Sequence, residues 1–157
     1  MEQKKLLAVG ATFPQLLGVD ARGREVKRSD FPGKKLIAYF YPKDNTPGCT
    51  AEACSLRDGY ARLGQAGYQV IGVSKDSEAS HQKFAAKYDL PFPLISDPEH
   101  RLCEEAGVWQ LKKMAGREYM GVVRTTFVLD ENGVVTHVIT KVNTKDAAGQ
   151  LVELLGL

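Results

Sequence analysis

The sequence has few cysteines and no long apolar run. Three cysteines in 157 residues are too few, and odd in number, for a small secreted scaffold held together by disulfides. No apolar segment approaches the ~20 residues that a membrane-spanning helix needs. The N-terminal segment 1–14 contains an apolar patch shorter than the ~7–15 residues of a signal-peptide core. These absences predict a cytoplasmic protein with no membrane segment.

An excess of charge of one sign is also missing. The 21 basic and 19 acidic side chains give a net charge of +2, so the charge balance favours neither nucleic acid nor an anionic membrane as a partner. Hydrophobic residues make up 43% of the chain and charged residues 25%, which is ordinary for a folded protein. Repeats, low-complexity tracts and linker-like stretches are absent. Length and composition predict one domain over residues 1–157, with a single sizeable core.

Apolar runs and helical patterns alternate along the chain. Continuous apolar runs predict strands buried on both faces, and Asn132-Gly133 is a strong hairpin signal. Ser77 is a candidate helix N-cap, and Pro91 ends that helix. The expected strands are 34–42, 68–76, 91–97, 122–130 and 134–141. The expected helices are 50–67, 77–90, 98–109 and 144–155.

The order of these elements predicts the fold class. Strands separated by helices pair in parallel, and the hairpin adds antiparallel strands. We therefore expect an α/β protein with a mixed central sheet and helices on both faces, in the manner of a thioredoxin-like fold.

Two cysteines lie five positions apart in "FYPKDNTPGCTAEAC", residues 40–54. Cys49 is expected where a strand ends and a helix begins. The unpaired N–H groups and positive end of a helix favour the thiolate there, and the thiolate is the nucleophile. On one regular helix, the Cα atoms of Cys49 and Cys54 would lie roughly 8–9 Å apart, whereas a disulfide needs them within about 7 Å. Either the two cysteines never pair, or the first turn unwinds.

The second alternative suggests a two-step thiol reaction. Cys49 attacks an electrophile while the turn is wound, and Cys54 captures the oxidised sulfur once the turn has opened. A sulfenic acid that condenses with a second thiol follows this scheme. Opening the end of a helix is among the least costly motions of a fold.

The segment "YPKDNTPGCTAEAC" resembles the active-site signature of the peroxiredoxins, P-x-x-x-T-x-x-C. With a second cysteine five residues further on, it is similar to the bacterioferritin comigratory protein, or peroxiredoxin Q, subfamily. The similarity extends from about Gly10 to the C-terminus and includes "VIGVSKDS", "LPFPLISDPE" and "RTTFVLDENG".

The resemblance implies a thiol peroxidase that reduces hydrogen peroxide and organic hydroperoxides. Cys49 matches the peroxidatic cysteine, which becomes a sulfenic acid, and Cys54 matches the resolving cysteine, which closes an intramolecular disulfide. Thioredoxin is the implied reductant, and no metal, haem or flavin is implied. Because resolution within one chain needs no partner subunit, we expect a monomer.

The resemblance also implies roles for the residues around the thiol. Thr46 would hold the attacked peroxide oxygen and contact the thiolate, and Pro42 would shield it from water. Gly48, Thr46 and Arg124 form the expected substrate-binding set. A fixed guanidinium such as that of Arg124 stabilises the negative charge that develops on the leaving oxygen. Glu52 would disfavour the thiolate unless it pairs with a cation, so we expect it to pair with and orient an arginine, with Arg124 as the candidate.

Other reactive or apolar residues have plainer interpretations. Cys103 is expected to pack in the core, although a second resolving role stays open. The three histidines show no metal-ligand pattern; His81 and His100 are expected in solvent and His137 on a strand face. Four side chains are expected to form an apolar wall beside the site or to pack in the core: Trp109, Met114, Tyr119 and Met120.

Two other functions remain as alternatives. A thioredoxin-type disulfide oxidoreductase would suit the fold, but the missing C-x-x-C motif and the presence of Thr46 count against it. The Cys49–Cys54 pair could also be a non-enzymatic redox switch that releases a binding surface when the helix melts.

Overall fold

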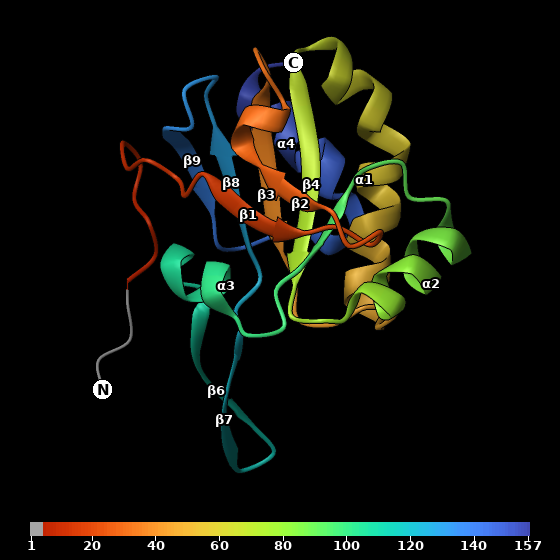
Figure 1. Cartoon of the computed structure of the whole chain (residues 1–157), viewed down its shortest axis with the longest axis vertical. Coiled ribbons are helices and arrows are strands. Elements are labelled where there is room, and N and C mark those ends of the chain that lie inside the picture. The colour runs from red at the N-terminus through yellow and green to blue at the C-terminus, as the bar shows by residue number, and fades with distance from the viewer. Residues whose placement is uncertain (1–4) are drawn as a thin grey trace.

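A computed structural model describes residues 5–157, and Figure 1 shows the arrangement of its elements. The expectation that segment 1–14 is not a signal peptide therefore falls partly outside the described residues. The strands are β1 Leu16–Val19, β2 Glu25–Lys27, β3 Lys35–Phe40, β4 Tyr68–Ser74, β5 Leu94–Ser96, β6 Trp109–Met114, β7 Arg117–Val122, β8 Thr125–Leu129 and β9 Val135–Ile139. The helices are α1 Pro47–Gln65, α2 Glu78–Tyr88, α3 Arg101–Ala106 and α4 Ala147–Leu155, with 3₁₀ turns at Arg28–Asp30 and Thr144–Asp146.

Seven of these strands form one mixed sheet in the order β2-β1-β5-β4-β3-β8-β9. Strands β3, β4 and β5 pair in parallel, as expected of strands joined by helices. Strand β8 runs antiparallel to β3 and forms the expected hairpin with β9. The prediction of a mixed sheet is confirmed.

The central strand β3 contributes side chains to two cores because successive residues point to opposite faces of the sheet. Leu36, Ala38 and Phe40 belong to the core that α3 covers. Ile37 and Tyr39 belong to the core beneath α1, α2 and α4. Figure 1 shows α1 and α2 on one side of the sheet and α3 on the other. The predicted helices on both faces are therefore present.

The two helices that border the candidate site begin and end close to where the sequence predicts. Pro47 is the first residue of α1, where its missing N–H is no loss. Ser77 caps α2 by accepting a hydrogen bond from the backbone N–H of Ser80. Helix α2 ends at Asp89, which has φ of 52°, shortly before Pro91.

Two hairpins were not expected from the sequence. The β1–β2 pair extends the sheet at one edge, and β6–β7 forms a separate two-stranded sheet that projects from the molecule in Figure 1. Met114, Tyr119 and Met120 are 65%, 40% and 39% exposed. The prediction of core packing is therefore wrong for these three residues, because an isolated two-stranded hairpin has no second layer to cover their side chains. Trp109, at the base of β6, does pack against the main core.

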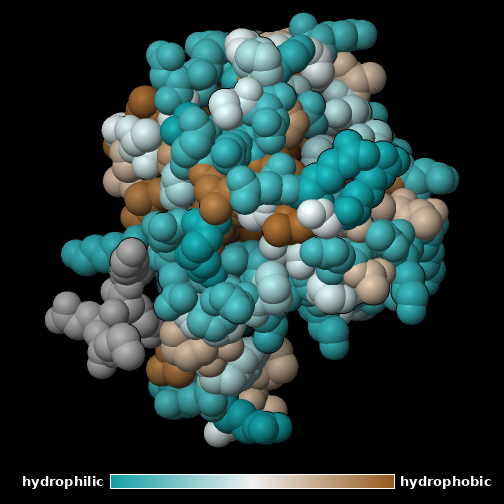
Figure 2. All heavy atoms as spheres, viewed as in Figure 1, coloured by the Kyte–Doolittle hydropathy of each residue, from teal (hydrophilic) through white to brown (hydrophobic). Residues whose placement is uncertain are grey.

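The surface of the β6–β7 hairpin carries exposed apolar side chains. Figure 2 shows them among hydrophilic ones on the projecting hairpin. Within residues 5–157, no helix has the length and apolar character needed to cross a membrane. The expectation of one domain over residues 1–157 stays a prediction.

Packing between α1 and α4 depends on a glycine. A Cβ atom at Gly59 would lie 2.5 Å from the Cβ of Ala148, whereas a Cβ at Gly64 on the same helix would have no atom within 4 Å. We expect Gly59→Ala to lower the free energy of unfolding by about 1–3 kcal/mol because of overpacking. Gly64→Ala, the matched control, should raise it by roughly 0.5–1 kcal/mol through helix propensity. Urea denaturation measures both; equal effects of the two substitutions would contradict this account of the helix contact.

Candidate active site

Cys49 lies in the first turn of α1, directly after the loop that leaves β3. The backbone of Thr46 is extended, with φ −102° and ψ 155°, and Pro47 starts the helix. The side chain of Cys49 is 1% exposed. The predicted position of this thiol at a helix start is confirmed, and it is a buried position.

Sheet register brings Arg124 to the same place. Phe40, the last residue of β3, pairs with Thr125, the first residue of β8. Because these strands are antiparallel, Arg124 lies beside the loop that leaves β3. Its Nη2 donates a hydrogen bond to Cys49 Sγ at 3.4 Å, and its Nη1 donates to Glu52 Oε1 at 2.6 Å. Arg124 therefore contacts two side chains of α1 that lie one turn apart, and the expected ion pair with Glu52 is present; its orienting role stays a prediction.

Gly48 leaves room for this guanidinium. A Cβ atom at Gly48 would lie 3.3 Å from Arg124 Nη2, which is tighter than an ordinary van der Waals contact. A side chain at this position would press on the group that reaches the sulfur.

The hydroxyl of Thr46 points back into its own loop. Thr46 Oγ1 donates a hydrogen bond to Lys43 O at 2.9 Å. Among the hydrogen bonds of residues 5–157, none joins Thr46 to Cys49, so the implied contact with the thiolate stays a prediction. Pro42 is half-buried at the start of the same loop, and its shielding role likewise stays a prediction.

The three cysteines form no disulfide with one another. Cys54 is half-buried and lies on α1 with Cys49. Cys103 is fully buried in the core beside Leu102 and Ala106. Burial raises the pKa of Cys103 above its ordinary value, and Asp97 adds to the shift. Cys103 therefore packs as an inert core residue in this structure.

Glu52 is a buried carboxyl group with one unpaired oxygen. Its side chain is 1% exposed, and burial raises its pKa from 4.5 to about 7, while Arg124 acts in the opposite direction. Glu52 Oε2 and the hydroxyl of Tyr39 have no hydrogen-bond partner among the described residues. Burial thus opposes the negative charge with which Glu52 compensates Arg124.

Lys112 is a second cation near the thiol that the sequence did not indicate. Its Nζ donates a hydrogen bond to Val122 O at 3.1 Å, across the base of the β6–β7 hairpin. Partial burial and the positive charge of Arg124 lower the pKa of Lys112. The pairing of β6 with β7 brings this lysine to the site, and no pattern in the sequence indicated that hairpin.

The chain is similar to known proteins over almost its whole length. The chain is 44% identical over 149 residues to peroxiredoxin Bcp of Bacillus subtilis, covering 95% of each chain. It superposes on the bacterioferritin comigratory protein of Xanthomonas campestris with a TM-score of 0.86 at 35% identity, covering 99% of this chain and 98% of that one. The structures of that relative concern its alkyl peroxide reduction activity. Residues 9–138 match the AhpC/TSA family.

The chain belongs to the AhpC/TSA family. The recognition of a peroxiredoxin of the Bcp and peroxiredoxin Q kind is confirmed. The thioredoxin-like α/β fold is confirmed as well, since relatives with this fold cover nearly the whole chain. Like those relatives, this AhpC/TSA protein is a thiol-dependent peroxidase.

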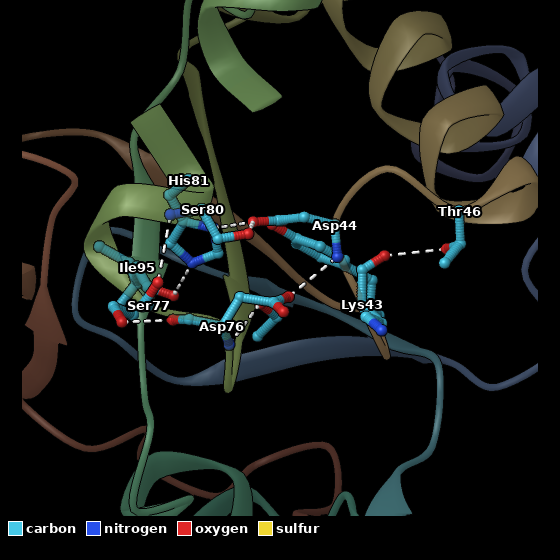
Figure 3. Close-up of polar contacts among 11 residues, drawn as sticks. Lys43, Asp44, Thr46, Asp76, Ser77, Ser80, His81 and Ile95 are labelled. Atoms are coloured by element: carbon cyan, nitrogen blue, oxygen red, sulfur yellow. Dashed lines mark hydrogen bonds and ion pairs between the residues drawn. The ribbon is translucent and has the colours of Figure 1, made fainter. Parts of the chain in front are cut away.

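One cluster of buried polar residues beside the site was missed from the sequence. Ligand-type atoms of Asp44, Asp76 and His81 lie within 4.8 Å of one another, and Figure 3 shows their contacts. The expectation that His81 faces solvent is wrong, because its side chain is 0% exposed and lies 2.7 Å from Asp44. A signal did exist: Asp44 and Asp76 follow the ends of neighbouring parallel strands, which meet at one edge of the sheet.

The buried carboxyl group of Glu52 predicts a pH dependence of stability. Its pKa is raised in the folded chain, so its neutral form favours folding; this contribution is complete below about pH 4.5 and is lost as pH rises through about 7. We expect the wild type to lose stability relative to Glu52→Gln between about pH 5 and pH 8. Urea denaturation across this range measures the difference.

The exposed Glu153 offers a matched control. Glu153→Gln removes a carboxylate from the surface of α4 and should follow the wild-type curve. Parallel pH curves for the wild type and Glu52→Gln would show that burial does not favour the neutral form of Glu52.

Proposed function

We propose that Cys49 is the peroxidatic residue of this peroxidase. The observation that carries the proposal is the 3.4 Å hydrogen bond from Arg124 Nη2 to the buried Cys49 Sγ. The thiolate sulfur forms a bond to one peroxide oxygen while the O–O bond breaks. The other oxygen leaves as alkoxide or hydroxide and takes up a proton, giving alcohol or water. The sulfur is oxidised to a sulfenic acid.

The neighbouring residues would stabilise this displacement. Arg124 lies where it can face the leaving oxygen as negative charge develops there. Thr46 would hold the attacked hydroperoxide through its hydroxyl, Gly48 would leave room for the guanidinium, and Pro42 would limit the access of water. Hydrogen peroxide and alkyl hydroperoxides are the proposed substrates, since the Xanthomonas campestris relative is described by its alkyl peroxide reduction activity.

Cys54 is the proposed resolving residue. Its thiol attacks the sulfenic sulfur and a disulfide forms. The hydroxyl group of the sulfenic acid takes up the thiol proton and leaves as water. A dithiol reductant of the thioredoxin type then restores both thiols by disulfide exchange. Because both cysteines lie on α1 of one chain, the cycle needs no second subunit, and a monomer acting in the cytoplasm fits it.

Substitution of single cysteines tests these roles. We expect Cys49→Ser to lower peroxide consumption to the uncatalysed background, because serine is not ionised at neutral pH. Cys54→Ser should consume a single equivalent of peroxide per chain and then stop with thioredoxin as reductant. Cys103→Ala, the control at a buried thiol, should turn over at a rate within about twofold of wild type. Continued turnover by Cys54→Ser would rule out its resolving role.

Disulfide formation should be accompanied by a loss of helix. An intact helix keeps the two cysteine Cα atoms roughly 8–9 Å apart, beyond the reach of a disulfide. We expect peroxide oxidation of the wild type to remove the circular dichroism signal of roughly 4–7 helical residues. Cys54→Ser should keep its helical signal. A disulfide that forms in the wild type with no loss of helical signal would contradict the proposed unwinding.

A further inference from the structure

A single peptide group connects Thr46 with the buried cluster beside the site. The carbonyl oxygen of Lys43 accepts the hydroxyl hydrogen of Thr46 at 2.9 Å. The N–H of the same peptide group, that of Asp44, donates to Asp76 Oδ2 at 2.9 Å. Figure 3 shows the two hydrogen bonds on opposite sides of this peptide. The chain of contacts runs from the carboxylate of Asp76 through one peptide to the hydroxyl of Thr46.

Asp76 is itself held in place at the end of β4. Ser74 Oγ donates a hydrogen bond to Asp76 Oδ2 at 2.7 Å, and the backbone N–H of Asp76 donates to Ser74 Oγ at 3.1 Å. Ser96, on the neighbouring strand β5, donates its hydroxyl hydrogen to the carbonyl oxygen of Asp76. The acceptor for the Asp44 N–H therefore lies just after the carboxyl end of β4 and is hydrogen-bonded to both β4 and β5.

The side chain of Asp44 fixes the other half of this loop. Its carboxylate accepts hydrogen bonds from Tyr41 at 2.6 Å and from Ser80 at 2.8 Å. His81 Nδ1 lies 2.7 Å from Asp44 Oδ2, and His81 Nε2 lies 3.0 Å from Ile95 O. The side chains of Asp44 and His81 are 3% and 0% exposed. Rotation of the peptide between Lys43 and Asp44 would break its two hydrogen bonds, to Asp76 and from Thr46, and the contacts of the Asp44 side chain fix one end of it.

We propose that Asp76 is a positioning residue for the peroxidase reaction, acting on Thr46 through the peptide group between Lys43 and Asp44. A hydrogen bond from an N–H to a carboxylate is stronger than one between neutral groups, and it polarises the peptide, so the carbonyl becomes a better acceptor. The hydroxyl group of Thr46 thereby donates its hydrogen to Lys43 O. The lone pairs of Thr46 Oγ1 are left to accept a hydrogen bond from the O–H of a hydroperoxide. This inference rests on the substrate-binding role proposed for Thr46.

A double-mutant cycle tests whether Asp76 acts through Thr46. Thr46 makes no side-chain cap hydrogen bond with α1, so Thr46→Val removes the hydroxyl without removing such a cap. The measured quantities are the second-order rate of Cys49 oxidation by hydrogen peroxide and the rate of Cys49 alkylation by iodoacetamide. Alkylation needs the thiolate but no bound hydroperoxide.

We expect Asp76→Ala to slow oxidation about tenfold and to change alkylation by less than about twofold. Asp76→Asn keeps an acceptor for the Asp44 N–H but loses the charge, so it should recover only part of the oxidation rate. In the Thr46→Val background, Asp76→Ala should slow oxidation by less than about twofold. An equal slowing in both backgrounds, or a parallel fall in alkylation, would overturn the proposal.

Two further variants keep the test decisive. Asp97 follows β5, and its carboxylate accepts the backbone N–H of Cys103 at 2.9 Å. Asp97→Ala therefore removes another carboxylate that follows a strand and accepts a backbone N–H. It should lower stability and leave oxidation in the folded protein within about twofold of wild type. If Asp76→Ala does not fold, Ser74→Ala removes the serine that supports Asp76 and should show the same coupling to Thr46. Absence of Cys49 oxidation in the wild type would instead refute the proposed function.

Discussion

The contacts of one guanidinium determine how this site is built. Arg124 lies 3.4 Å from the sulfur of Cys49 and 2.6 Å from an oxygen of Glu52, two side chains separated by one turn of α1. These contacts require α1 to begin after the short loop that leaves β3, and they require β8 to begin where β3 ends. Gly48 leaves room for the guanidinium, since a Cβ atom there would lie 3.3 Å from Arg124 Nη2. The antiparallel strand within an otherwise parallel sheet centre is therefore part of the chemistry, since it supplies the cation.

Burying this charged pair does not by itself favour the folded state. Desolvation offsets much of the attraction between buried charges, and Glu52 also leaves one oxygen unpaired. The raised pKa of Glu52 expresses that cost. A carboxyl group at Glu52 can restrain Arg124 through their ion pair. A raised pKa limits its negative charge, which would otherwise disfavour the thiolate of Cys49 one turn away. Perturbed groups of this kind are typical of functional sites.

Local sequence patterns were sufficient to predict the strands and helix starts whose cause lies within a few neighbouring residues. The continuous apolar runs indicated β3 and β4, and Ser77 indicated the start of α2, because each signal lies within a few residues of its effect. The pairing of Glu52 with Arg124 was also predictable, since a carboxylate near a thiolate needs a cation. Burial of His81 was missed, because its partner Asp44 lies 37 positions away and only the meeting of strand ends links the two. The β6–β7 hairpin was missed because its apolar residues alternate irregularly with lysines and face no second layer.

The two sides of Pro47 differ in how firmly they are held. Upstream, Asn45 Oδ1 accepts hydrogen bonds from Lys87 and Tyr88 of α2, and Asp44 is fixed by the buried cluster. Downstream, the first turn of α1 lacks a side-chain cap, a difference that costs a helix about 1 kcal/mol. Its first backbone hydrogen bond joins Thr50 N to Thr46 O at 2.8 Å. Opening this turn would release Cys49 while the loop with Thr46 stays in place. In the proposed cycle, the turn that would unwind begins after the loop that holds Thr46, so Thr46 would keep its place while Gly48 and Cys49 move.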